Sequence, residues 1–290
     1  MRRQTSARDR ALRALSDLPP FSPVLDRVLA SVARDDCPYS RLAGMIEKDT
    51  VLAGNLLKVV NSALFGRRGT VNSVGHAVSL LGIVRLRNAA LAMSVARMWR
   101  AARAAPGWSP ARFNLHSVGV AFVTDLVAQR APVQYAEGAF AAGLFHDLGR
   151  LLIATGCRDE WVAIERAVEA GEDICEAERD ALGVSHCELS AEAIRLWGLP
   201  DPIAVAARHH HCPGHDDTPV PPGRLRLSEL VHAADRFANQ RGIAIRCEAP
   251  SADARHAAKD AFSPLGLEDR ASDIAEAFDR EYGAISGFLS

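Results

Sequence analysis

The sequence predicts an all-α protein. Ala and Leu are abundant, aromatic residues make up only 6% of the 290 residues, and few segments alternate apolar and polar residues with period two. Apolar residues recur instead at spacings of three and four, which is typical of amphipathic helices. With 48% hydrophobic and 24% charged residues, the composition is that of a globular protein with a substantial core, and it excludes a fibrous or wholly disordered chain.

Turn and capping residues mark the helices of the first half. A Pro-rich turn at 19–23 precedes an apolar stripe over 24–32. Ser40 and Asp49 are candidate N-caps for the next two helices. A turn-rich loop at 66–75 then leads into a long Ala-rich helix that we expect to end near Ala105.

The second half is predicted to contain the central helices. One helix extends from about Pro110 to Ala131, and residues 139–153 are apolar nearly all round, so that helix should lie at the centre. An S-x-x-E capping box at 185–188 begins another helix, with His186 in its first turn. Asp201-Pro202 opens a helix that ends in three histidines, and the last fifty residues show two weaker amphipathic helices.

Charge and targeting signals limit the function classes. The 34 basic and 35 acidic residues give a net charge of −1, which argues against binding nucleic acid mainly through phosphate neutralisation. Residues 1–14 form a basic arm, which we interpret as a solvated terminus. No apolar run reaches the length of a membrane span and no apolar segment follows the N-terminal arginines, so we predict a cytoplasmic protein without a membrane partner. The six cysteines form no C-x-x-C pair and are expected to be buried in a reducing compartment.

Histidines and aspartates at helical positions suggest a metal site. His146-Asp147 is an adjacent pair inside an apolar helix, where a charged carboxylate is costly unless it is paired or bound to a metal. Imidazole and carboxylate ligands together suit Fe, Mn or Zn, and a helical bundle can gather them from several helices. Two plainer interpretations stay open, because the pair could be hydrogen-bonded without metal and the three histidines at 209–211 could be a solvated helix end.

Several motifs in order resemble the HDOD domain, a member of the HD superfamily of metal-dependent phosphohydrolases. FHDLGR at 145–150 is similar to the H-D-x-G-K/R signature, and the resemblance extends over about residues 15–240. It implies an all-helical bundle in a bacterial signalling or regulatory protein, with residues 241–290 as a C-terminal helical extension. The other matching segments are LPPFSPVLDRVL at 18–29, IEKDTVLAGNLLKVVNSALFG at 46–66, VNSVGHAVSLLGIVRLRNAAL at 71–91, HCELSAEAIRLWGLPDPIAVAARHHH at 186–211 and LVHAAD at 230–235.

The catalytic relatives, the HD-GYP cyclic-dinucleotide phosphodiesterases, imply a complete ligand set here. If the chain is an enzyme, Asp147 and Arg150 are the expected catalytic residues, with Arg150 standing where those enzymes have Lys. The G-Y-P segment is missing, so the substrate contacts of that subfamily do not carry over. The metal ligands implied by the resemblance are His116, His146, Asp147, His186, His209, His210 and Asp235.

Two functional hypotheses follow. We favour a regulatory module that binds a signalling protein or a small nucleotide-like ligand without turnover, with Fe, Mn or Zn as a bound metal. The alternative is a metal-dependent phosphohydrolase or phosphodiesterase acting on a nucleotide or cyclic dinucleotide. DNA binding through the basic arm or the arginines at 85, 87 and 97 is disfavoured. Cys187 and Cys212 adjoin candidate ligands, but burial without function is the expectation for both, and His211 and His215 are expected in a solvated loop.

Overall fold

The computed structural model describes residues 6–18, 25–27, 29–30, 39–63, 70–246 and 254–289. Within these ranges the chain is helical and forms no β-strand, apart from an isolated bridge between Val133 and Leu225. The all-α prediction is therefore confirmed. Most of the predicted helix over 24–32 lies outside the described residues, although 25–27 and 29–30 are helical.

The described α-helices, in chain order, are α1 (Ala7–Ser16), α3 (Tyr39–Lys48), α4 (Thr50–Ala63), α5 (Val74–Leu81), α6 (Ile83–Arg100), α7 (Pro110–Ala128), α8 (Ala139–Phe145), α9 (Leu148–Gly156), α10 (Arg158–Glu169), α11 (Ile174–Leu182), α12 (His186–Leu196), α13 (Asp201–His209), α14 (Leu227–Gln240), α15 (Ala254–Phe262) and α16 (Ala271–Ser286). Short 3₁₀ turns lie at Ala136–Gly138, Pro213–His215, Ser263–Leu265 and Glu268–Arg270.

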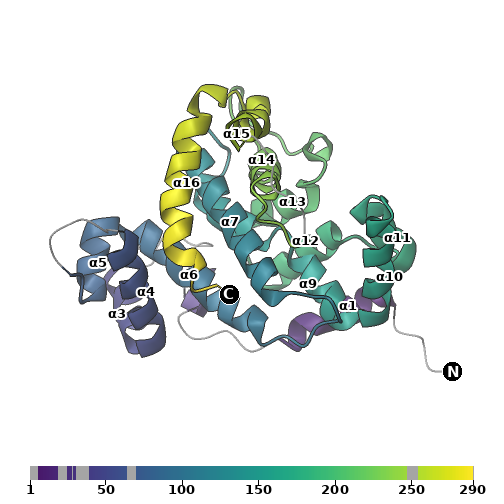
Figure 1. The fold of residues 1–290 in the computed structure, drawn as a ribbon, viewed down its shortest axis with the longest axis horizontal. Coiled ribbons are helices and arrows are strands. Elements are labelled where there is room, and N and C mark those ends of the chain that lie inside the picture. Colours follow the sequence, from purple (N-terminus) through teal and green to yellow (C-terminus); the bar gives the residue numbers. More distant parts are fainter. Residues whose placement is uncertain are drawn as a thin grey trace.

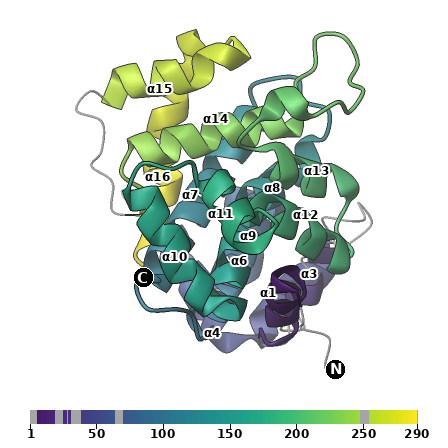
Figure 2. The same ribbon diagram turned by 90° about the vertical axis from the view of Figure 1, so that its right-hand side faces the viewer.

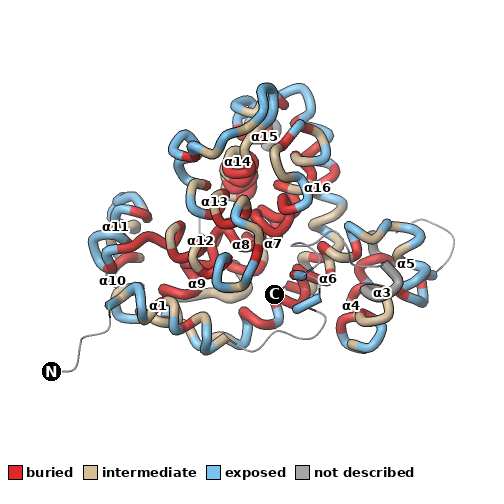
Figure 3. The backbone as a smooth tube through the Cα atoms, turned by 180° about the vertical axis from the view of Figure 1, so that it is seen from behind, coloured by how far each residue is buried: buried red, intermediate tan, exposed pale blue. Residues whose placement is uncertain are grey.

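Helix α7 is the centre of the fold. It packs against α8, α14 and α16. Helix α12 packs against both α9 and α13 (Figure 1). Helices α3, α4 and α5 form a smaller group at one side, and α16 lies between that group and α7, contacting both α4 and α7. Turning the molecule by 90° shows α15 packed on α14 at one end and α1 at the opposite end (Figure 2). Most residues of α7, α8 and α9 are buried (Figure 3).

A glycine lets the two innermost helices approach each other. A Cβ atom on Gly143 of α8 would lie 2.7 Å from the Cα atom of Ala121 on α7, closer than real Cβ contacts allow. Every residue of α8 is buried, as the apolar sequence of 139–145 predicts. This close packing holds the end of α8 next to α7, where the candidate site begins.

Two predicted helices are each divided by a break. The helix expected over 139–153 ends at Phe145 and resumes at Leu148, so His146 and Asp147 occupy the junction between α8 and α9. The long helix expected to end near Ala105 is divided at Gly82, whose φ of 78° lies in the left-handed region that favours glycine. Helix periodicity does not reveal such breaks because both halves keep the same apolar spacing.

The basic arm predicted over residues 1–14 needs correction. Residues 7–16 form α1, whose Ala11 and Ala14 are buried against the rest of the molecule, chiefly α9. The side chains of Arg8 and Arg10 remain exposed but make ion pairs with Glu192 and Glu160. Residues 7–16 are thus a packed helix, because Ala11 and Ala14 form an apolar face, and residues 1–5 of the predicted arm lie outside the described residues.

Candidate metal centre

Five helical elements contribute imidazoles and carboxylates to one buried cluster. The side chains come from α7, from the α8–α9 junction, from the first turn of α12, from the end of α13 and from α14. Its members are His116, His146, Asp147, His186, His210, His211 and Asp235. Residues far apart in the sequence therefore meet, which the sequence resemblance implied and spacing alone could not establish.

The break between α8 and α9 places the His146-Asp147 pair in the cluster. Asp147 has φ −102° and ψ 14°, a sparsely populated backbone conformation that ends α8 and starts α9. Nε2 of His146 lies 3.6 Å from Oδ2 of Asp147. Inside a continuous helix, neighbouring residues would point about 100° apart around the axis. The junction thus turns two consecutive side chains to the same cluster.

A second glycine brings α12 against the start of α9. A Cβ atom on Gly149 would lie 2.1 Å from the carbonyl oxygen of His186, and the backbone N–H of Gly149 donates to Oγ of Ser190 at 2.8 Å. The capping box predicted for α12 is present, with Ser185 as N-cap and Glu188 as its partner. Together these features place His186 next to Asp147.

The first ligand group surrounds one oxygen of Asp147 and one of Asp235. Nε2 of His116 lies 3.2 Å from Oδ1 of Asp235 and 3.3 Å from Nε2 of His146. The same atom of His116 is 3.7 Å from Oδ2 of Asp147. Nε2 of each of the two imidazoles thus lies within ion-pair distance of both carboxylates, and these four groups are of the ligand type that Fe, Mn and Zn accept.

The second ligand group lies on the other oxygen of Asp147. Oδ1 of Asp147 is 3.2 Å from Nε2 of His186 and 3.5 Å from Nε2 of His210. Nε2 of His211 lies 3.1 Å from Nε2 of His186. The Asp147 carboxylate therefore stands between the two groups, with one oxygen directed to each.

Hydrogen bonds at Nδ1 orient the four most buried imidazoles. His116, His146 and His210 donate from Nδ1 to the carbonyl oxygens of Ile243, Gly143 and Ala207, at 2.7, 2.8 and 2.7 Å. Nδ1 of His186 donates to Oε2 of Glu178 at 2.6 Å. Each bond places a proton on Nδ1, so that Nε2 is the nitrogen that faces the cluster and is able to bind a metal. Metal-binding histidines are held in this way.

Two polar atoms in the cluster are buried without a hydrogen-bond partner among the described residues, Oδ1 of Asp147 and Nε2 of His210. An unpaired buried polar atom costs roughly 1–3 kcal/mol. Both atoms are electron-pair donors that face the same space, so a divalent cation there would satisfy them together. The residues present therefore fit a bound metal ion.

Burial and charge shift the pKa values of the cluster in opposite directions. Burial lowers the pKa of His146 to about 4 and keeps its imidazole neutral. Burial also acts to lower the pKa of His186, but Glu178 and Asp147 outweigh it and hold that pKa well above its usual value. For Asp147, burial is outweighed by the facing histidines, which hold its pKa well below the usual range.

The histidine pair at the end of α13 differs from the predicted one. His210 is fully buried in the cluster as expected, but its partner is His211, whereas His209 belongs to neither ligand group within the described structure. Helix α13 ends at His209, and the turn that follows directs His210 and His211 inward. His211 thus lies in the loop after α13 and is partly exposed, as expected, but its Nε2 faces His186 in the second ligand group.

The side chain of Arg150 contacts α10. Its guanidinium lies 3.4 Å from Oε1 of Glu165 and stacks over Trp161 with the central carbon 5.8 Å from the ring centroid. Both partners belong to α10. The charge of Arg150 thus supports the packing of α9 on α10, and its proposed phosphate contact stays a prediction.

Sequence reasoning missed two residues that hydrogen-bond to the ligands and one cysteine that lies near them. Glu178 is fully buried and binds both the backbone N–H and Nδ1 of His186, each at 2.6 Å. Nδ1 of His232 donates to the carbonyl oxygen of His210 at 2.7 Å and so supports the end of α13. Cys175 lies beside Cys187. The only available signal was Glu178, a glutamate on the apolar face of an amphipathic helix. This signal does not indicate which residue the glutamate contacts.

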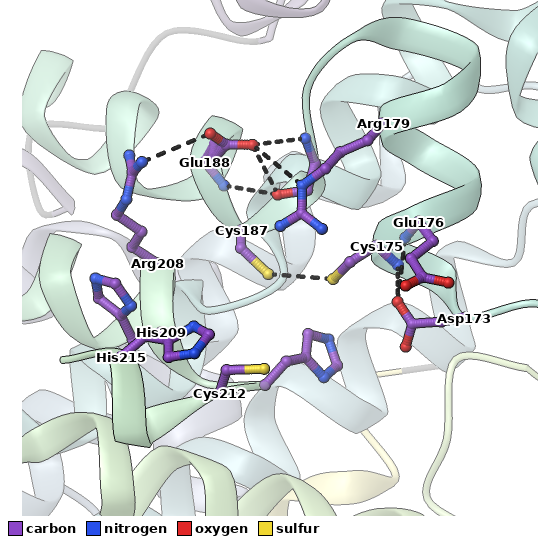
Figure 4. A pocket seen from close by; sticks show the side chains of 12 residues that line it. Asp173, Cys175, Glu176, Arg179, Cys187, Glu188, Arg208, His209, Cys212 and His215 are labelled. Atoms are coloured by element: carbon purple, nitrogen blue, oxygen red, sulfur yellow. Dashed lines mark hydrogen bonds and ion pairs between the residues drawn. The ribbon is translucent and has the colours of Figure 1, made fainter.

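A cavity of about 540 Å³ adjoins the second ligand group (Figure 4). His211 and the two cysteines at 175 and 187 line it, so the cavity connects the second group to the exterior. Glu188 lies at its rim between two arginines, with Oε1 3.5 Å from Arg208 and Oε2 4.0 Å from Arg179. The cavity is large enough for a small ligand.

A family comparison identifies the domain. The model of the HDOD domain matches residues 18–213, which is more than half of the chain. This chain belongs to the HDOD domain family. The match includes the α8–α9 junction and the histidines at the end of α13, so both ligand groups lie in or next to the HDOD domain.

Known proteins are similar to this HDOD protein in sequence or in fold. An uncharacterised protein of Treponema pallidum (strain Nichols) is 25% identical over 202 residues, which is 68% of this chain but only 38% of that protein. The chain therefore spans less than two thirds of its curated relative. Among solved structures, a candidate phosphohydrolase from Shewanella amazonensis SB2B is 20% identical, with a TM-score of 0.74 and coverage of 97% of this chain and 98% of its own.

A candidate signal transduction protein from Marinobacter aquaeolei VT8 is also similar, at 20% identity and a TM-score of 0.71. The match covers 98% of this chain and 65% of that one. At such identities the likeness establishes the helical-bundle fold, as the sequence predicted. Within the described residues, no helix combines the length and apolar character needed to cross a membrane.

Proposed function

We propose that this HDOD protein is a metal-dependent phosphohydrolase acting on a nucleotide-like phosphoester in bacterial signalling. The observation that carries the proposal is the position of the Asp147 carboxylate, whose two oxygens face two separate groups of histidines. A carboxylate shared in this way is suited to join two metal ions. His116, His146 and Asp235 would hold one ion with Asp147, and His186, His210 and His211 would hold the other.

Bound metal ions would polarise a phosphoryl oxygen and lower the pKa of bound water to about 7. The chain's own residues keep the centre ready for this chemistry. The hydrogen bonds of Nδ1 hold the imidazoles in place, and burial of the centre strengthens electrostatic interactions by excluding water. The adjoining cavity gives a phosphoester a route to the second group through His211.

Metal content and turnover test the proposal together. The full chain, purified without chelator or an affinity metal, is analysed by elemental mass spectrometry beside Asp147→Ala. We expect stoichiometric Fe, Mn or Zn in the wild type and its loss in the variant, with hydrolysis of a linear or cyclic dinucleotide or an aryl phosphodiester lost in parallel. A matched control is Asp125→Ala, because Asp125 lies on α7, accepts from Gln129 and belongs to neither ligand group. A wild type that neither contains nor takes up metal would overturn the proposal.

A second candidate function is a metal-containing regulatory module without turnover. The arginines near the site favour it, because those at 179 and 208 share Glu188 and Arg150 is paired with Glu165. A phosphoester would have to displace these carboxylates to gain a cationic contact. Stoichiometric metal with no turnover of any tested phosphoester, combined with saturable nucleotide binding by calorimetry, would support this function over hydrolysis.

A further inference from the structure

Two cysteines outside the proposed phosphohydrolase centre face two of its histidines. Sγ of Cys175 lies 3.7 Å from Sγ of Cys187, and Sγ of Cys187 lies 3.4 Å from Nε2 of His186. Nε2 of His211 lies 3.1 Å from Nε2 of His186. The four donor atoms all lie within 4.8 Å of one another. They come from α11, from the first turn of α12 and from the segment after α13.

These separations match a tetrahedral site. Zinc bonds of about 2.3 Å to sulfur and about 2.0–2.1 Å to nitrogen place tetrahedral ligand atoms about 3.8 Å apart for two sulfurs, about 3.6 Å for sulfur and nitrogen and about 3.3 Å for two nitrogens. The three distances in the protein follow the same order and are each slightly shorter. Three of the six separations therefore suit one tetrahedral ion, and the other three are each below 4.8 Å.

The surroundings of the four residues also suit a metal. Both thiols are largely buried, and Glu178 holds Nδ1 of His186 so that its Nε2 faces Sγ of Cys187. The cavity of about 540 Å³ is lined by three of the four residues and supplies an entry path. Cys212 lines the same cavity but is exposed and lies outside the group of four. A position beside the cavity is therefore not sufficient to place a residue in this group.

We propose that Cys175, Cys187, His186 and His211 form a thiolate site for a soft divalent metal, with zinc as its occupant. Thiolate ligands select zinc, whereas the carboxylate group around Asp147 also suits Fe or Mn. His186 has one lone pair, because its other ring nitrogen donates to Glu178. Zinc in the thiolate site therefore withdraws His186 and His211 from the second ligand group. This competition rests on the proposed metal centre, whereas the thiolate site needs only its own four ligands.

Cobalt(II) provides the test, because a thiolate ligand produces a near-ultraviolet charge-transfer band that nitrogen and oxygen ligands do not. The full chain is stripped of metal, kept reduced and titrated with cobalt(II), followed by zinc(II). We expect the band in the wild type, its loss on addition of zinc, and its complete absence in the double variant Cys175→Ala/Cys187→Ala. The matched control is Cys212→Ala, which should keep the band. A band that is absent from the wild type, or present in the double variant, would overturn the proposal.

Two further measurements separate the thiolate site from the proposed phosphohydrolase. Asp147→Ala should keep the cobalt band while losing the carboxylate centre, so the failure of either site is visible without the other. X-ray absorption at the zinc edge of the wild type does not depend on the folding of any variant. A sulfur shell at about 2.3 Å supports the site, and a shell of nitrogen and oxygen alone refutes it. Zinc should also reduce any iron- or manganese-dependent turnover more strongly in the wild type than in the double variant, where zinc acts only by exchange at the carboxylate centre.

Discussion

Gly149 lies so close to His186 that a Cβ atom on the glycine would be 2.1 Å from the carbonyl oxygen of the histidine. The neighbour is backbone at the start of α12, which is held by its capping box and cannot yield as a flexible side chain would. The approach of α9 and α12 therefore depends on a missing side chain at one position, and this approach places His186 beside Asp147.

Replacing Gly149 by Ala should separate α9 from α12 and weaken the site. Overpacking of this kind costs about 1–3 kcal/mol or more, which lowers Tm by several degrees in a chain of this size. The same variant should bind less metal, as measured by elemental analysis. Gly283→Ala is the matched control, because a Cβ atom there meets nothing within 4 Å inside α16 and should raise Tm slightly. A Gly149→Ala protein as stable and as metal-rich as the wild type would contradict this account.

Glu178→Gln should reduce metal affinity without changing any ligand. The carboxylate of Glu178 accepts from Nδ1 of His186 and raises its basicity, and loss of such a partner typically costs 10–100-fold in affinity. The measurement is competition for the metal against a chelator of known affinity. Glu176→Gln, on the same helix but exposed, is the control and should bind metal as the wild type does. Equal affinities for the two variants would show that Glu178 has no such role.

Alanine substitutions of His209 and His211 should have different effects on metal content, although the two residues are only two positions apart. His211→Ala removes a member of the second ligand group and should lower the metal content, whereas His209→Ala should leave it unchanged. Elemental mass spectrometry of both variants, each checked for the helical content of the wild type, decides between them. The opposite pattern would restore the ligand pair expected from the sequence resemblance.

Metal binding should strengthen as the pH rises. His116 and His186 have raised pKa values, so protons compete with the metal for their Nε2 atoms until the pH exceeds those values. Asp147 has a lowered pKa and is already ionised, so it adds no pH dependence near neutrality. Calorimetry in buffers of different ionisation enthalpy should detect proton release at neutral pH. The release should decrease in Glu178→Gln, because the charge of Glu178 helps to raise the His186 pKa. Binding without proton release would contradict the assignment.

Local patterns predicted most of the architecture. The capping box at 185–188, the proline at the start of α7 and the apolar character of 139–153 all act within a few residues, and the structure has helices at these positions. The His146-Asp147 pair was predictable as a site because a carboxylate in an apolar segment requires a partner. The break between its two helices was not, since the apolar residues on both sides continue without a gap.

The sequence alone determined the helical class, the order of the motifs and the HD pair, because each depends on residues close together in the chain. Only the tertiary structure decided that His211 rather than His209 joins His210, that Arg150 pairs with Glu165, and that Cys175 meets Cys187 and His186. Helical periodicity sets the direction of a side chain around its own axis. Where a helix stops, and how closely it crosses another, depends on packing between distant segments, such as the approach of α12 to Gly149.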